Sequence, residues 1–118
     1  MGLVIRKEHL DNILNGLKSV ELRKQNTKKR HKIALCNKGK IYGFAQIVDS
    51  YQVPRTQLLT PQWEMKHRAT KFLQRGSYSK EESLWVWELS DVQKLAMPID
   101  YVHPRGAIIW VDINVEDE

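Results

Sequence analysis

The sequence predicts a single α+β domain in which five or six short strands form a β-barrel flanked by two or three helices. Its 118 residues match the size of one ordinary domain, with enough apolar side chains (42%) to build one core. Runs with the alternation of β-strands outnumber helical runs, and glycine, proline and polar residues separate them. Many short strands around one small core are typical of a barrel.

The N-terminal part of the chain begins with a strand and a helix. Residues 3–5 are apolar and predict a strand. In residues 7–15 apolar side chains recur at helical spacing, and Gly16 is a suitable C-cap. Residues 19–23 alternate between polar and apolar side chains, so we expect a half-buried strand whose polar residues face outward.

The middle of the chain predicts a hairpin and then a second helix. Residues 25–30 are polar and basic and predict a loop without apolar anchors. Residues 32–37 and 41–49 have β-type patterns on either side of a short turn. We expect residues 51–60 to form a loop, and residues 61–74 to form a helix that starts with Pro61.

Two further strands complete the predicted barrel. Residues 84–89 are dense in β-formers, and residues 107–113 are the most apolar run of the chain. We assign residues 1–113 to the domain and residues 114–118 to an acidic C-terminal tail.

Positive charge is concentrated in one part of the chain. The net charge is +5, which favours anionic partners such as nucleic acid, although an acidic protein would suit the same surface. Between residues 18 and 40 there are nine basic residues and one acid, Glu21. The nine are Lys18, Arg23, Lys24, Lys28, Lys29, Arg30, Lys32, Lys38 and Lys40.

Several classes of site are excluded by the sequence. The single cysteine, Cys36, allows neither an internal disulfide nor a cysteine-based zinc site. The histidines lack the HxH and HExxH spacings of metal sites, and no dinucleotide, P-loop or serine-hydrolase motif occurs. We therefore expect no metal and no cofactor. No run approaches the roughly 20 apolar residues of a membrane span, and no signal peptide is evident, so we expect a cytoplasmic protein with no membrane partner.

Residues 16–23, with the sequence GLKSVELR, resemble the GxKxxExR signature of ASCH domains at all four specified positions. Residues 26–30, 43–49 and 103–110 and the strand around Trp87 are similar to later landmarks of that family, so the resemblance covers nearly the whole chain in order. It implies a PUA-like β-barrel and an RNA-linked role. Branches of the family act as ribonucleases, as DNA binders, or as amidohydrolases on N4-acylated cytidine.

Lys18, Glu21 and Arg23, here called the charged cluster, are the strongest candidates for a functional site. Glu21 and Arg23 share one strand face with Cα atoms about 7 Å apart, and Lys18 enters from the preceding turn. A phosphate or carbonyl group fits between Lys18 and Arg23. Glu21 either orients Arg23 or, with a raised pKa, serves as a general base. The alternative is an ion pair on an exposed strand.

Other residues are candidates for nucleic-acid contact around the charged cluster. Trp87 either stacks on a base or belongs to the core, whereas Trp85 and Trp110 are expected in the core. The basic residues between Lys24 and Lys32 either contact phosphates or form a solvated loop. The complete predicted nucleic-acid interface comprises Lys18, Arg23, Lys24, Lys28, Lys29, Arg30, Lys32, Trp87 and Arg105.

Two functions use the same residues. The first is a module that binds RNA, another nucleic acid or a modified nucleoside; the alternative is a hydrolase, either a ribonuclease or an amidohydrolase on N4-acylated cytidine. The amidohydrolase branch has a threonine where this chain has Glu21. A carboxylate there stabilises the ammonium form of Lys18, so in a hydrolase we expect Glu21 to be the base.

Overall fold

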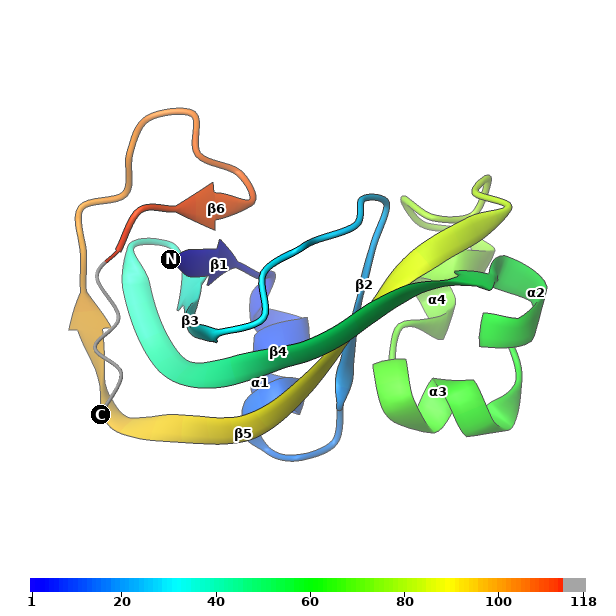
Figure 1. Ribbon diagram of the computed structural model, residues 1–118, viewed down its shortest axis with the longest axis horizontal. Coiled ribbons are helices and arrows are strands. Elements are labelled where there is room, and N and C mark those ends of the chain that lie inside the picture. Colours follow the sequence, from blue (N-terminus) through cyan, green and yellow to red (C-terminus); the bar gives the residue numbers. More distant parts are fainter. Residues whose placement is uncertain (114–118) are drawn as a thin grey trace.

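The computed structural model describes residues 1–113; the predicted acidic tail, residues 114–118, lies outside the described residues. Within the described part the chain forms six strands and four helices, which confirms the α+β class (Figure 1). In chain order they are β1 (Gly2–Val4), α1 (Lys7–Leu14), β2 (Val20–Arg23), β3 (Lys32–Asn37), β4 (Lys40–Pro54), α2 (Arg55–Leu58), α3 (Pro61–His67), α4 (Thr70–Gln74), β5 (Ser83–Asp100) and β6 (Trp110–Val111).

One mixed sheet has the strand order β2-β5-β4-β3-β1-β6. Its backbone is the long antiparallel ribbon of β4 and β5, which curves through the molecule (Figure 1). Three shifts of register interrupt this ribbon, and such bulges increase local twist and bend the strands. The helices α2, α3 and α4 lie at one end of the ribbon, and β1, β3 and β6 lie at the other.

The sheet does not close into a barrel. Strands β2 and β6 are its two ends, and no backbone pairing joins them in the described residues. Side chains nevertheless bridge the gap, because Arg23 of β2 donates a hydrogen bond to the Val4 carbonyl of β1 at 3.1 Å. Trp87 of β5 also stacks on Trp110 of β6, with ring centroids 5.8 Å apart. The closed barrel is therefore not confirmed, and the opening between β2 and β1 is spanned by side chains.

The predicted β3–β4 hairpin is confirmed, but both long strands extend further than expected. Strand β4 continues to Pro54 through the segment expected to be a loop, and α2 follows it. Strand β5 continues through residues 90–100, most of which are exposed. This extension is held mainly by backbone pairing with β4 and little by burial. Its sequence therefore lacks a strong alternation of apolar and polar residues.

The predicted helix over residues 61–74 is divided in two. Arg68 adopts the left-handed conformation with φ of 50°, which ends α3, and α4 starts at Thr70. The predicted strand over residues 107–113 is also shorter than expected, since only Trp110 and Val111 pair with β1.

Two apolar clusters form most of the core. One joins α1 to the curved sheet and includes Leu10, Ile13 and Trp87. The other lies between the sheet and α2–α4 and includes Leu58 and Leu73. In the described residues no helix has the length and apolar character needed to span a bilayer.

Candidate functional site

Lys18 is positioned by the turn that follows α1. Gly16 adopts the left-handed conformation with φ of 78°, and the backbone N–H groups of Leu17 and Lys18 both donate to the Asn12 carbonyl. This turn brings Lys18 to the start of β2 with only 2% of its surface exposed. Its Nζ donates to the His67 carbonyl at 2.5 Å and lies 3.4 Å from Glu21 Oε1.

His67 holds the carbonyl group that Lys18 contacts. Its ring is fully buried, Nδ1 accepts from the Ala69 N–H at 2.9 Å, and Nε2 donates to the Leu58 carbonyl at 2.7 Å. These two bonds require a neutral ring with its proton on Nε2. Burial lowers the pKa of His67, which is consistent with that state. No local sequence pattern indicates this structural role of His67, because its partners come from its fold contacts.

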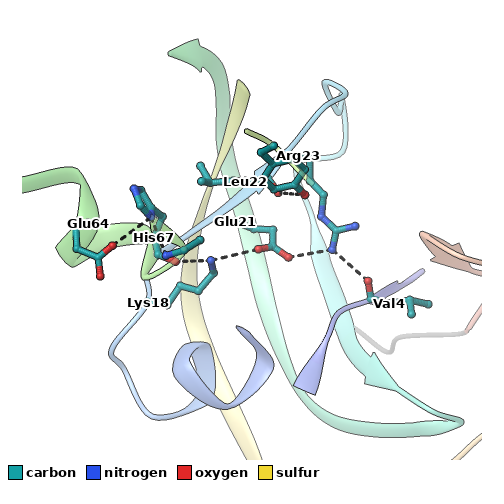
Figure 2. A network of polar contacts seen from close by, with 9 residues as sticks. Val4, Lys18, Glu21, Leu22, Arg23, Glu64 and His67 are labelled. Atoms are coloured by element: carbon teal, nitrogen blue, oxygen red, sulfur yellow. Dashed lines mark hydrogen bonds and ion pairs between the residues drawn. The ribbon is translucent and has the colours of Figure 1, made fainter. Parts of the chain in front are cut away.

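Glu21 lies between the two cations of the charged cluster. Arg23 Nη2 donates to Glu21 Oε2 at 2.9 Å and also reaches the Val4 carbonyl. Figure 2 shows the resulting chain of contacts from His67 through Lys18, Glu21 and Arg23 to Val4. The predicted convergence of the three charges is thus observed.

The prediction that the polar residues of this strand face outward into solvent is wrong. Glu21 is only 3% exposed, and Val20 and Leu22 on the opposite face are buried as well. Helices α3 and α4 cover the apolar face, and the polar face turns into the opening between β2 and β1. An ion pair on an exposed strand is therefore excluded for Glu21 and Arg23, whose side chains are 5% and 17% exposed.

The electrostatics of the charged cluster correct the predicted role of Glu21. Burial by itself raises the pKa of Glu21, but the charges of Lys18 and Arg23 outweigh it and hold that pKa below its usual value. Burial lowers the pKa of Lys18, and Glu21 partly opposes the shift. Glu21 is therefore a carboxylate at neutral pH and a poor base, contrary to the expectation for a hydrolase. Of the two residues, Lys18 is the one shifted towards the neutral form.

A cavity of about 250 Å³, here called the first cavity, lies against the charged cluster. It opens where the two apolar clusters meet, between α1, α4 and the strand ends. It is lined by Val4, Ile5, Arg6, His9, Lys18, Glu21, Leu22, Arg23, Asn37, Ala69, Phe72, Ser77, Tyr78 and Ile108. More than half of these residues are polar or charged, so the cavity offers many hydrogen-bonding groups beside a smaller apolar surface.

Several polar residues that line the first cavity were not predicted from the sequence, among them Asn37, Tyr78 and His9. Asn37 donates to the Ile5 carbonyl at 2.8 Å, and Tyr78 donates to the Leu22 carbonyl at 3.0 Å. His9 packs on Phe72 at 4.9 Å between ring centroids, and its buried Nδ1 has no hydrogen-bond partner in the described part of the chain. Each residue is isolated in the sequence, so only the tertiary fold reveals the grouping.

A second cavity of about 200 Å³ adjoins the first and shares Arg23 and Tyr78 with it. Its other lining residues are Lys24, Gln25, Trp87 and Ile109. Trp87 is 2% exposed, donates from Nε1 to the Gln25 carbonyl at 3.0 Å, and lies 5.6 Å from the Arg23 guanidinium. The residue therefore belongs to the core and also lines a cavity, and its stacking on a base stays a prediction.

The other tryptophans lie at the edge of the core. Trp85 and Trp110 are partly buried and pack against the first apolar cluster, as expected. Trp110 is also covered by Lys29, whose Nζ lies 4.8 Å from the ring centroid.

The basic segment, residues 24–32, leads away from the two cavities. Lys28 and Arg30 are exposed, whereas Lys29 and Lys32 are partly buried against aromatic rings. The loop has an anchor that the sequence did not reveal, because Thr27 is buried and its hydroxyl accepts from the Lys29 N–H.

Some predicted residues are not brought to the cavities. Arg105 is exposed in the segment before β6 and lines neither of them. His103, in the same segment, also lines neither cavity; it contacts Tyr101 and the Ala107 carbonyl.

Metal-ligating residues are not grouped in this fold. Among residues 1–113, no three His, Cys, Asp or Glu side chains are placed to hold a metal ion. Cys36 is buried, and burial raises its pKa to about 11, so its thiol is protonated and unreactive at neutral pH.

Comparison with known proteins places the fold. No family model and no curated protein matches the sequence. Among solved structures, the chain is similar to ASCH from Zymomonas mobilis, with 19% identity and a TM-score of 0.70 over 83% of this chain and 71% of that one. A serine-to-alanine mutant of the Zymomonas protein matches at 18% identity and a TM-score of 0.72, over 93% and 86% of the two chains. A tyrosine-to-phenylalanine mutant of the same protein matches at 19% identity and a TM-score of 0.64, over 83% of this chain and 73% of that one. The chain therefore has the fold of an ASCH domain, which confirms in fold the resemblance seen in residues 16–23.

Proposed function

We propose that this protein binds RNA, or another nucleic acid, and holds a nucleotide in the first cavity. The observation that carries this proposal is the buried charged cluster, which is held by fixed hydrogen bonds at the wall of a cavity of about 250 Å³. Burying several paired charges costs free energy, because each charge loses its contact with water. Such buried clusters are concentrated at functional sites.

The chemistry of the first cavity suits a nucleobase. The base edges of RNA carry both donors and acceptors, and single-stranded RNA is recognised through these edges and through stacking. The cavity offers donors from Lys18 and Arg23, an acceptor in Glu21, and the aromatic rings of Phe72 and Tyr78. Lys18 and Arg23 are each held by two contacts, so little ordering is needed when a ligand binds.

The basic segment supports the phosphate part of the proposal. It follows Arg23 directly in the chain, so its exposed cations extend the positive surface from the two cavities. Contacts of this kind position a strand without reading its sequence, and they release counterions. Lys24, Lys28, Lys29, Arg30 and Lys32 remain the proposed phosphate contacts, whereas Arg105 lacks support from its position.

We also propose that the curved sheet is an opened version of a PUA-like barrel. The bridges from Arg23 to Val4 and from Trp87 to Trp110 join strands near the two ends of the sheet. The first cavity lies beside the Arg23–Val4 bridge, so the site and the incomplete closure have the same structural origin.

The test is a titration with a short single-stranded RNA, followed by tryptophan fluorescence at two salt concentrations. We expect salt-sensitive binding that weakens in Arg23→Lys and in the double variant Lys28→Ala/Lys29→Ala. Lys94→Ala is the matched control, since Lys94 is exposed on β5 and lines neither cavity. Absence of binding at low salt, or equal loss in the control variant, would contradict the proposal.

A hydrolase that uses the same cavity is the second candidate, and the buried Lys18 favours it. Its lowered pKa makes the neutral amine more accessible than in an ordinary lysine, so Lys18 rather than Glu21 is the proposed base. Incubation with RNA and with N4-acetylcytidine would detect either activity. Turnover should vanish in Lys18→Ala with the fold intact by circular dichroism; turnover that survives would remove Lys18 from the mechanism.

A further inference from the structure

The two adjoining cavities differ in chemistry, and this difference bears on the length of the ligand. We propose that the ligand is a nucleotide chain rather than a free nucleoside, with a base in the first cavity and the phosphodiester that follows it in the second cavity. This inference rests on the proposed function and adds a phosphate subsite to it.

Arg23 is the physical link between the two cavities. Its Nη2 donates to Glu21 and to the Val4 carbonyl, and its guanidinium carbon lies 5.6 Å from the centre of the Trp87 ring. The guanidinium plane is therefore held from two sides before any ligand arrives. The hydrogen bonds of this side chain within the described residues engage only Nη2, which leaves Nη1 and Nε as donors for a ligand.

The two cavities differ in whether a carboxylate lines them. The first cavity is lined by the cations Arg6, Lys18 and Arg23 and also by the Glu21 carboxylate, which repels a phosphate group beside it but accepts hydrogen bonds from a base. No acidic side chain in the described part of the chain lines the second cavity, where Arg23 and Lys24 supply two cations. A phosphodiester therefore meets cations without a carboxylate among the described lining residues only in the second cavity, and a base that donates hydrogen bonds meets an acceptor carboxylate only in the first.

Lys24 is available for such a ligand. Its Nζ lies 3.8 Å from Glu81, but both side chains are well exposed, at 53% and 38%. Exposed ion pairs of this kind contribute little free energy, so a phosphate between Arg23 and Lys24 competes with Glu81 effectively. The amide of Gln25 and the ring of Tyr78 complete the walls around that position.

The experiment compares cytidine, a cytidine monophosphate and the dinucleotide CpC by calorimetric titration, with the adenosine, guanosine and uridine series in parallel. We expect the dinucleotide to bind at least about tenfold more tightly than the nucleoside, because a phosphate gains charge-assisted hydrogen bonds from two cations. Lys24→Ala should remove most of this difference, because it should weaken binding of the dinucleotide far more than binding of the nucleoside. Lys94→Ala is the control for a general loss of positive charge.

The outcomes separate this inference from the proposed function. Equal affinity for nucleoside and dinucleotide, or an equal loss for both in Lys24→Ala, would overturn the phosphate subsite and leave nucleotide binding in place. If neither these probes nor a longer single-stranded RNA binds at low salt, the proposed function fails and the inference fails with it. A dinucleotide that binds where the nucleoside gives no signal supports the subsite.

Discussion

The charged cluster and the basic segment are neighbours in the chain and contain similar side chains, yet they differ in almost every physical respect. Lys18, Glu21 and Arg23 are held by short contacts inside the protein, whereas Lys28 and Arg30 are exposed to water. Buried charges interact strongly and are costly to leave unpaired, and exposed charges are screened by salt. Burial, rather than charge, therefore divides this region into a pre-organised site and an exposed surface that suits phosphates.

The largest effect is expected from removing the central charge of the cluster. Glu21→Gln leaves Lys18 and Arg23 as buried cations without their carboxylate, and we expect the free energy of unfolding to fall by about 3–5 kcal/mol. Urea denaturation would measure it. Glu82→Gln is the matched control, because Glu82 is exposed and should tolerate the change. Equal stability of the two variants would show that the cluster does not depend on its carboxylate.

A smaller loss is expected from His67, which acts on the cluster through its backbone. His67→Ala removes a fully buried ring and leaves the Ala69 N–H and the Leu58 carbonyl without partners. We expect the free energy of unfolding to fall by about 2–4 kcal/mol, measured by thermal or urea denaturation. His31→Ala serves as the exposed control. If both variants retain full stability, the buried hydrogen bonds of His67 are not important for the fold.

The pH dependence of stability should reveal the same carboxylate. The pKa of Glu21 in the folded state lies below its ordinary value of 4.5, so the folded state binds this proton less readily than the unfolded chain. The resulting stabilisation is fully present above pH 4.5 and is lost as the pH falls through the folded pKa. Unfolding midpoints measured from neutral to acid pH should therefore decline less steeply in Glu21→Gln than in the wild type. Parallel curves would contradict the lowered pKa.

The smallest effect on stability belongs to the basic segment, where the effect on binding is instead the informative one. Lys28→Ala/Lys29→Ala should change the urea midpoint only slightly, because neither lysine has an ion pair within the described part of the chain and the contact of Lys29 with the Trp110 ring contributes only about 0.5–1 kcal/mol. The slope of log affinity against log salt for single-stranded RNA should fall by about 0.7 for each phosphate that the variant no longer neutralises. An unchanged slope would show that this segment does not bind phosphates.

Much of the local structure could be predicted from residue patterns. The first helix, the β3–β4 hairpin and the core of β5 follow from apolar spacing and turn residues, which act over a few positions. Strand β5 beyond Leu89 and the break at Arg68 could not be predicted in this way. The extension of β5 depends on pairing with β4, which is distant in the sequence. The break at Arg68 depends on His67, which is buried by other elements.

The order and type of side chains were enough to establish the α+β class, the ASCH-like motif and the residues of the charged cluster. The tertiary fold was needed to show that Glu21 is buried between two cations, that the sheet stays open beside it, and that His9, Asn37 and Tyr78 share its cavity. The reason is physical: burial and pKa depend on what packs against a side chain, and those neighbours come from distant parts of the chain.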